Sequence, residues 1–114
     1  MKIERFEDIK AWQKAKGLTV QIYKELSESR DYSFKDQIQR ASVSIMNNIA
    51  EGFERQGNKE FRYFLYVAKG SCAEVRSMLY LVSELQMIEE SKCNELRDLT
   101  IEISKMLSGL IKTL

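Results

Sequence analysis

Apolar residues recur every three or four positions along almost the whole chain, and no proline interrupts them. A chain of 114 residues with average composition would hold about six prolines. Their absence, together with only five glycines, favours long helices joined by short turns. The helical spacing covers roughly residues 9–28, 34–52, 59–86 and 92–113. The sequence therefore predicts an all-α fold, a single antiparallel up-down-up-down four-helix bundle that spans residues 1–114 as one domain.

The predicted helices carry recognisable end signals. Asp8 is expected to cap the first helix, because its carboxylate can accept hydrogen bonds from the free backbone donors of the first turn. The other predicted boundary residues are a capping box at Ser33 and Asp36, a stop at Gly52 and a cap at Ser91. Gly17 lies inside the first helix, where glycine costs about 0.5–1 kcal/mol relative to alanine. We therefore expect a close packing contact at Gly17.

The composition excludes several classes of enzyme. The chain has no histidine, so it cannot build a Ser-His-Asp or Cys-His triad, a His-ligated zinc site or a di-iron site with Glu-x-x-His ligands. Its two cysteines, Cys72 and Cys93, are too few for a disulfide framework or a four-thiolate metal site, and we expect them to be buried or half-buried thiols. We predict no catalytic residue, no metal and no cofactor. The enzymatic alternative pairs the carboxylates of Glu51 and Glu74, without a supporting motif.

The charge pattern indicates a protein of the cytoplasm. The net charge is +1, and the longest stretch without a charged residue covers only residues 41–50. That stretch is far shorter than the ~20 apolar residues that span a bilayer. The first residues lack the apolar core of a signal peptide. We therefore expect a cytoplasmic location and no membrane partner.

A polar stripe accompanies the apolar face of the second predicted helix and continues on the third. Its members are Gln37, Arg40, Ser44, Asn48, Glu51 and Gly52 in the second helix and Gly70, Ser71 and Glu74 in the third. A solvated face is usually richer in Lys and Glu, so this composition favours a hydrogen-bonded network, either between the two helices or across a subunit contact. Within it we expect Arg40 to pair with Glu51 or Glu74. The alternative is an ordinary solvated face.

The sequence also resembles a known family. The residues that carry the resemblance are QIQRA at 37–41, SI at 44–45 and NIAEG at 48–52. The opening FEDI and WQKA segments and, in the third helix, KEF, FL and AKGS with Glu74 are similar too. This pattern resembles the bacterial four-helix-bundle proteins first noticed as products of intervening sequences in 23S rRNA genes. Gln39 is one departure, because many relatives have a second basic residue there.

The resemblance implies a four-helix bundle that assembles into a homo-oligomeric ring, often a pentamer. A related group, the accessory proteins of diversity-generating retroelements, resembles basic rings that bind nucleic acid and reverse transcriptase. The implied partners are therefore further copies of the chain, RNA or DNA, and a nucleic-acid enzyme. The family has no catalytic residue to carry over, and its cellular role is largely unassigned.

Basic residues gather on two helix faces. The candidate nucleic-acid-binding residues are Lys10, Lys14 and Lys24 in the first helix and Lys59, Arg62, Tyr66, Lys69 and Arg76 in the third. Basic side chains interleaved with tyrosines can contact phosphates and stack on unpaired bases. The alternative is a solvated face on which tyrosine rings cover the core.

Two functions remain open from the sequence. The first is a non-enzymatic, homo-oligomeric interaction protein that binds RNA or DNA through its basic helix faces. The second is a structural scaffold that binds only itself or a protein partner. Aromatic and apolar residues outside the four helical stripes support self-association in both cases, because a contiguous apolar patch marks a subunit interface.

Overall fold

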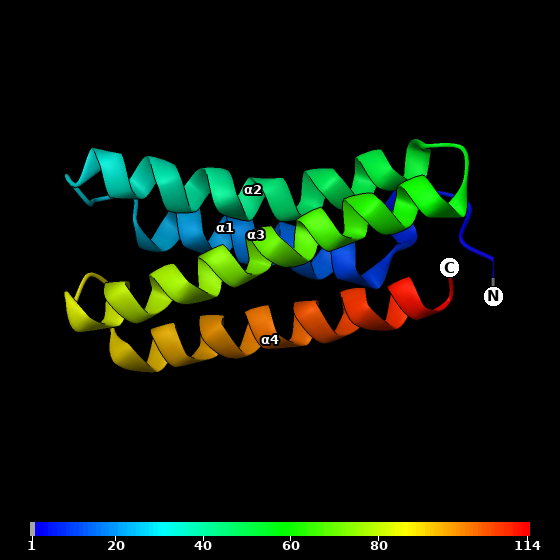
Figure 1. The fold of residues 1–114 in the computed structure, drawn as a ribbon. Helices are drawn as coiled ribbons and strands as arrows, with labels where there is room; N and C mark the ends of the chain where they lie inside the picture. Colours follow the sequence, from blue (N-terminus) through cyan, green and yellow to red (C-terminus); the bar gives the residue numbers. More distant parts are fainter. Residues whose placement is uncertain (1) are drawn as a thin grey trace.

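In the computed structural model, residues 2–114 form four α-helices and one short 3-10 helix (Figure 1). The elements are η1 (Phe6–Asp8), α1 (Lys10–Glu25), α2 (Tyr32–Glu54), α3 (Asn58–Glu84) and α4 (Glu90–Lys112). The all-α prediction is confirmed. The largest difference in helix bounds is at α1, which ends at Glu25 instead of residue 28.

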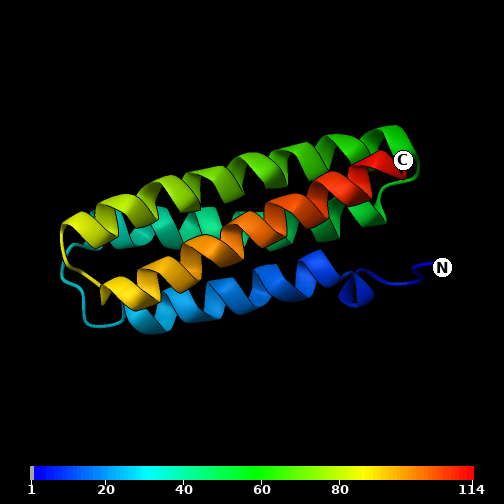
Figure 2. The ribbon, with the colours of Figure 1, turned by 90° about the horizontal axis from the view of Figure 1, so that it is seen from below.

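The helices pack as a square in chain order. Each helix contacts the next along the sequence, and α1 closes the square against α4. Helices α1 and α3 therefore occupy diagonal corners, and both chain ends lie at the same end of the bundle (Figures 1 and 2). This is the predicted up-down-up-down topology. Within residues 2–114, no helix combines the length and the apolar character that crossing a membrane requires.

One apolar core runs the length of the bundle. Each helix contributes a buried stripe, for example Leu18, Ile45, Leu79 and Leu107, which are completely buried. Burial of a side chain of this size stabilises the fold by about 1.5–3 kcal/mol. Thr19 is a buried polar exception whose Oγ1 donates to the α1 backbone and, at 3.2 Å, to a backbone carbonyl of α2. The periodic apolar residues of the sequence are thus the core.

The three predicted cap residues were wrong. Asp8 belongs to η1, and Ile9 stands at the start of α1 without a side-chain cap. Helix α2 begins earlier than expected, where the Asp31 carboxylate accepts from the backbone N–H of Phe34 at 3.2 Å. This earlier cap replaces the predicted capping box at Ser33 and Asp36. Helix α4 begins after Glu89, so Ser91 lies inside the helix, and its hydroxyl donates to the Glu89 carboxylate. Several residues could cap each end, and packing of the first turn selects among them.

The expectations for two glycines were also wrong. Gly52 does not end α2, which continues to Glu54, and Gly52 is buried. An alanine Cβ there would lie 2.6 Å from Phe64 Cβ and 3.1 Å from Phe61 Cδ1 of α3. At Gly17, by contrast, a Cβ would meet nothing within 4 Å, so α1 makes no close contact there. The close helix approach that we expected at Gly17 occurs at Gly52.

Candidate functional site

The basic stripe of α3 lies along its seam with α4. Lys69 Nζ donates to Ser108 Oγ of α4 at 2.8 Å. The Arg62 guanidinium donates to the backbone carbonyl oxygen of Leu114, just beyond the end of α4. Contacts to α4 therefore hold two of the predicted basic side chains in place.

Helix α4 adds a cationic residue that we did not single out from the sequence. The Arg97 guanidinium lies over the Tyr80 ring of α3, 4.6 Å from its centroid. Its Nη2 donates to the side-chain oxygen of Asn94, whereas Nη1 is buried and finds no acceptor among residues 2–114. We define the basic surface as Lys59, Arg62, Tyr66, Lys69, Arg76 and Tyr80 of α3 together with Arg97 of α4.

The basic surface keeps its positive charge. Its cations form none of the ion pairs with side-chain carboxylates found within residues 2–114. Tyr66 and Tyr80 are more than half exposed between these cations. The surface therefore offers charged donors and aromatic rings along one seam.

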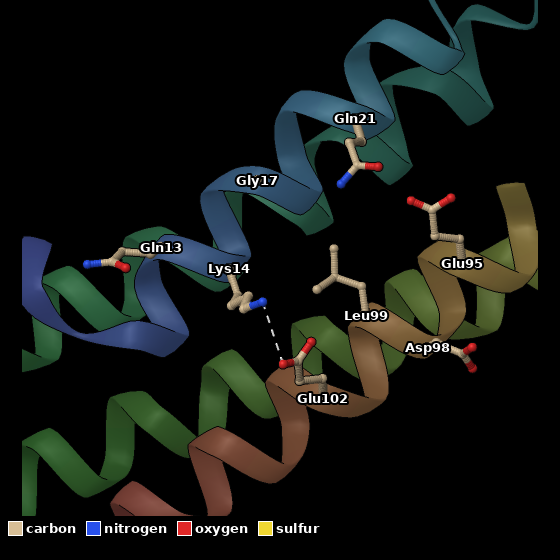
Figure 3. Close-up of a pocket in the computed structure, with 8 residues that line it drawn as sticks. All are labelled: Gln13, Lys14, Gly17, Gln21, Glu95, Asp98, Leu99 and Glu102. Carbon is tan, nitrogen blue, oxygen red and sulfur yellow. Dashed lines mark ion pairs between the residues drawn. The ribbon is translucent and has the colours of Figure 1, made fainter.

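The three lysines of α1 lie elsewhere. Lys14 Nζ is 3.6 Å from the Glu102 carboxylate of α4, across a groove of about 410 Å³ (Figure 3). Glu95 and Asp98 also line this groove, but Figure 3 shows them farther along it, and the carboxylate that Lys14 faces is that of Glu102. Lys10 and Lys24 are exposed on the same helix. Because α1 is diagonal to α3, the structure does not bring the two predicted basic faces together.

Part of the polar stripe forms a hydrogen-bonded network between α2 and α3. Ser44 Oγ lies 2.9 Å from Ser71 Oγ, across the seam of the two helices. Asn48 Nδ2 donates to the backbone carbonyl of Ser44 at 2.8 Å and to its hydroxyl at 3.0 Å. Ser44, Asn48 and Ser71 thus join α2 to α3 at the middle of the bundle.

The charged members do not join this network. Arg40 pairs with Asp36 at 2.8 Å and Glu51 with Arg55 at 2.8 Å, so the predicted pairing of Arg40 with Glu51 or Glu74 is wrong. The physical reason is that a partner four residues away on the same helix is already within reach. Both pairs are exposed, and exposed pairs contribute at most about 1 kcal/mol.

The remaining members of the stripe are divided between core and surface. Gly52 is buried against α3, whereas Gln37, Gly70 and Glu74 are exposed. Glu74 forms no ion pair with any residue that the structure describes. The outer side of α2 and α3 therefore carries polar groups that the fold itself does not use.

Both cysteines are free and buried, as expected. Cys72 Sγ donates to the backbone carbonyl of Thr100 at 3.1 Å and links α3 to α4. Burial raises the pKa of Cys72 from 9.0 to about 11, and it also raises the pKa of Cys93. Both thiols stay protonated at neutral pH.

The Cys72 thiol should react slowly and make stability depend on pH. Each pH unit below the pKa lowers the thiolate fraction tenfold, so alkylation at pH 8 should be about 100-fold slower in the native than in the urea-unfolded protein. Since the folded pKa is raised, the associated stabilisation is complete below about pH 9 and is lost as the pH rises to about 11. Mass spectrometry after iodoacetamide treatment measures the rate, and urea unfolding measures the stability. In a Cys72→Ala variant, most of the decline in unfolding free energy between pH 9 and 11 should disappear. If the decline is unchanged, it arises from the titration of other groups.

Comparison with known proteins identifies the family. Residues 7–109 match the model of the 23S rRNA-intervening sequence protein family. A solved structure from Bacteroides thetaiotaomicron, described as a protein with unknown function from the S23 ribosomal protein family, is 27% identical, with a TM-score of 0.83. The alignment covers 90% of this chain and 98% of that chain. No curated protein matches. The chain belongs to the 23S rRNA-intervening sequence protein family.

Proposed function

We propose that the chain is a non-enzymatic, homo-oligomeric interaction protein that binds RNA or DNA through the basic surface. The observation that carries this proposal is a row of cations on α3 and α4 that form no ion pair with a side-chain carboxylate of residues 2–114, interleaved with two exposed tyrosines. Cations of this kind bind phosphates by releasing counterions, and tyrosine rings stack on bases of any sequence.

The arrangement favours nucleic acid over a small ligand. The contacts of Lys69 to Ser108 and of Arg97 to Tyr80 order the cations along the seam, so little side-chain entropy is lost on binding. Among the described residues, no group of three His, Cys, Asp or Glu side chains is placed to hold a metal ion. Together with the absence of histidine from the sequence, this supports binding rather than catalysis.

Neutralising Lys59, Lys69 and Arg76 to glutamine should weaken nucleic-acid binding at least about 30-fold at low salt. Loss of three phosphate contacts should also reduce the slope of log K against log salt by about three. Fluorescence anisotropy of a single-stranded RNA, a single-stranded DNA and a DNA duplex over a salt series measures both quantities.

The matched control neutralises Lys10, Lys14 and Lys24 of α1, which removes the same charge from another corner of the bundle. We expect this control to retain most of the affinity and the slope. Equal losses in both triple variants would make the effect one of net charge rather than of the basic surface. If the unaltered protein does not bind at low salt, the nucleic-acid proposal fails.

A purely structural scaffold is the second candidate function. Exposed apolar side chains favour it, namely Tyr63 and Leu81 of α3 and Leu85 directly after its end. This alternative predicts self-association without salt-dependent binding of nucleic acid. The same anisotropy series, combined with light scattering, separates the two candidates.

A further inference from the structure

Helix α3 carries a second exposed face beside the basic surface. Its residues recur at intervals of four and seven, and the pattern continues to Leu85, which follows the last residue of α3. We name them the apolar ridge: Tyr63, Gly70, Glu74, Leu81 and Leu85. Tyr63 is 63% exposed, Leu81 47% and Leu85 57%. At Gly70 a Cβ would meet nothing within 4 Å, so the middle of the ridge is open. The ridge thus has exposed apolar side chains toward its two ends and an open middle at Gly70 and Glu74.

A groove of about 400 Å³ lies on the outer side of α2. It is lined by Tyr23 of α1 and by Arg40, Val43, Ser44, Asn47 and Asn48 of α2. The groove carries the Arg40 guanidinium. Within residues 2–114 of its own chain, Arg40 forms one ion pair, with Asp36, and both side chains of this pair are exposed. The ridge, in contrast, carries the Glu74 carboxylate, which is unpaired within the described residues. The two surfaces are complementary in charge.

The two surfaces also match in height along the bundle axis. Helices α2 and α3 are antiparallel, and the bond between Ser44 and Ser71 places these residues level with each other. At a rise of 1.5 Å per residue, Arg40 lies about 6 Å and Glu74 about 4.5 Å from that level, in the same direction. Gly70 lies close to the level itself, between Val43 and Asn47 of the groove.

This agreement in height has a consequence for symmetry. Rotation about an axis parallel to the bundle leaves the height of every residue unchanged. A neighbouring copy generated by such a rotation therefore brings Glu74 of one chain level with Arg40 of the next. The ridge on α3 and the groove on α2 lie at adjacent corners rather than on opposite sides, so each copy turns relative to the last. A head-to-tail contact of this kind closes into a ring when a whole number of such rotations completes a full turn.

We propose that the apolar ridge of one copy docks into the α2 groove of the next copy, with Glu74 paired with Arg40 of that neighbour. The inference rests on the proposed homo-oligomer and names its interface. The missing side chain of Gly70 admits Val43 and Asn47 of the neighbour to the α3 backbone. The exposed Asp36 pair is weak enough for Arg40 to exchange partners. The contact leaves the basic surface of α3 and α4 free, once per copy around the ring.

Charge reversal with rescue tests the interface. Arg40→Glu and Glu74→Arg each place like charges opposite one another, and we expect each variant to weaken assembly at least about 100-fold. The Arg40→Glu/Glu74→Arg double variant restores opposite charges and should assemble like the unaltered protein. Light scattering and sedimentation over a concentration series report the mass in multiples of 13.3 kDa.

Two further variants remove ambiguity. Gly70→Trp should block docking and leave the helical content unchanged, because its side chain points into open space. Glu95→Arg, on the α1–α4 groove, is the matched control and should assemble normally. If both single charge variants assemble normally, or the double variant fails to regain assembly, this interface is overturned while the homo-oligomer stands. If the unaltered protein is a 13.3 kDa species at every concentration, the proposed self-association itself fails.

Discussion

Replacing Gly52 with alanine lowers the free energy of unfolding by about 3 kcal/mol. The new Cβ would lie 2.6 Å from Phe64 Cβ, a distance that neither atom can relieve by rotating a side chain. Helices α2 and α3 must therefore separate at Gly52, which also disturbs the packing of Phe61. Urea unfolding followed by circular dichroism, at one fixed protein concentration, measures the change.

Gly109→Ala is the matched control for this result. Gly109 is an exposed glycine within α4, and a Cβ there meets nothing within 4 Å. The substitution removes only the low helix propensity of glycine, so the unfolding free energy should rise by about 1 kcal/mol. If Gly52→Ala is as stable as Gly109→Ala, the close approach of α2 and α3 is not a requirement of the fold.

The fold was predictable because the sequence pattern is redundant. The apolar residues repeat over many turns, so one unusual residue such as Gly52 does not alter the helical prediction. Helix ends depend on one or two residues instead. Asp31 and Ser33 both suit a cap by residue type, and the structure places the cap at Asp31.

The site was only partly predictable, for a geometric reason. The pattern on one helix shows which residues share a flank, but not which helix covers that flank. The sequence predicted a close contact at Gly17 and a helix end at Gly52, yet of these two glycines only Gly52 meets another helix. Arg97 escaped attention because its role depends on the neighbouring Tyr80 ring, and Arg40 was assigned a distant carboxylate although Asp36 was within reach.

Helix α3 has different chemistry on its two flanks. The flank toward α4 carries cations that no side-chain carboxylate of residues 2–114 neutralises. The other flank carries the apolar ridge and the Glu74 carboxylate. Variants on one flank should therefore leave the function of the other intact. If the Gly70→Trp variant loses both assembly and nucleic-acid binding, binding needs several copies of the basic surface, as multivalent binding does.

Truncating Ile45 to alanine is expected to lower the unfolding free energy by about 4 kcal/mol. Ile45 is completely buried, and its removed atoms leave a cavity that the surrounding helices fill only in part. Ile101→Ala is the control, because Ile101 is 37% exposed on the surface of α4 and should cost less than about 1 kcal/mol. Urea unfolding of both variants at the same protein concentration gives the comparison. Equal losses would mean that the core does not lie along the stripe that Ile45 occupies. The arrangement of the helices, and with it the assignment of the two faces of α3, would then be wrong.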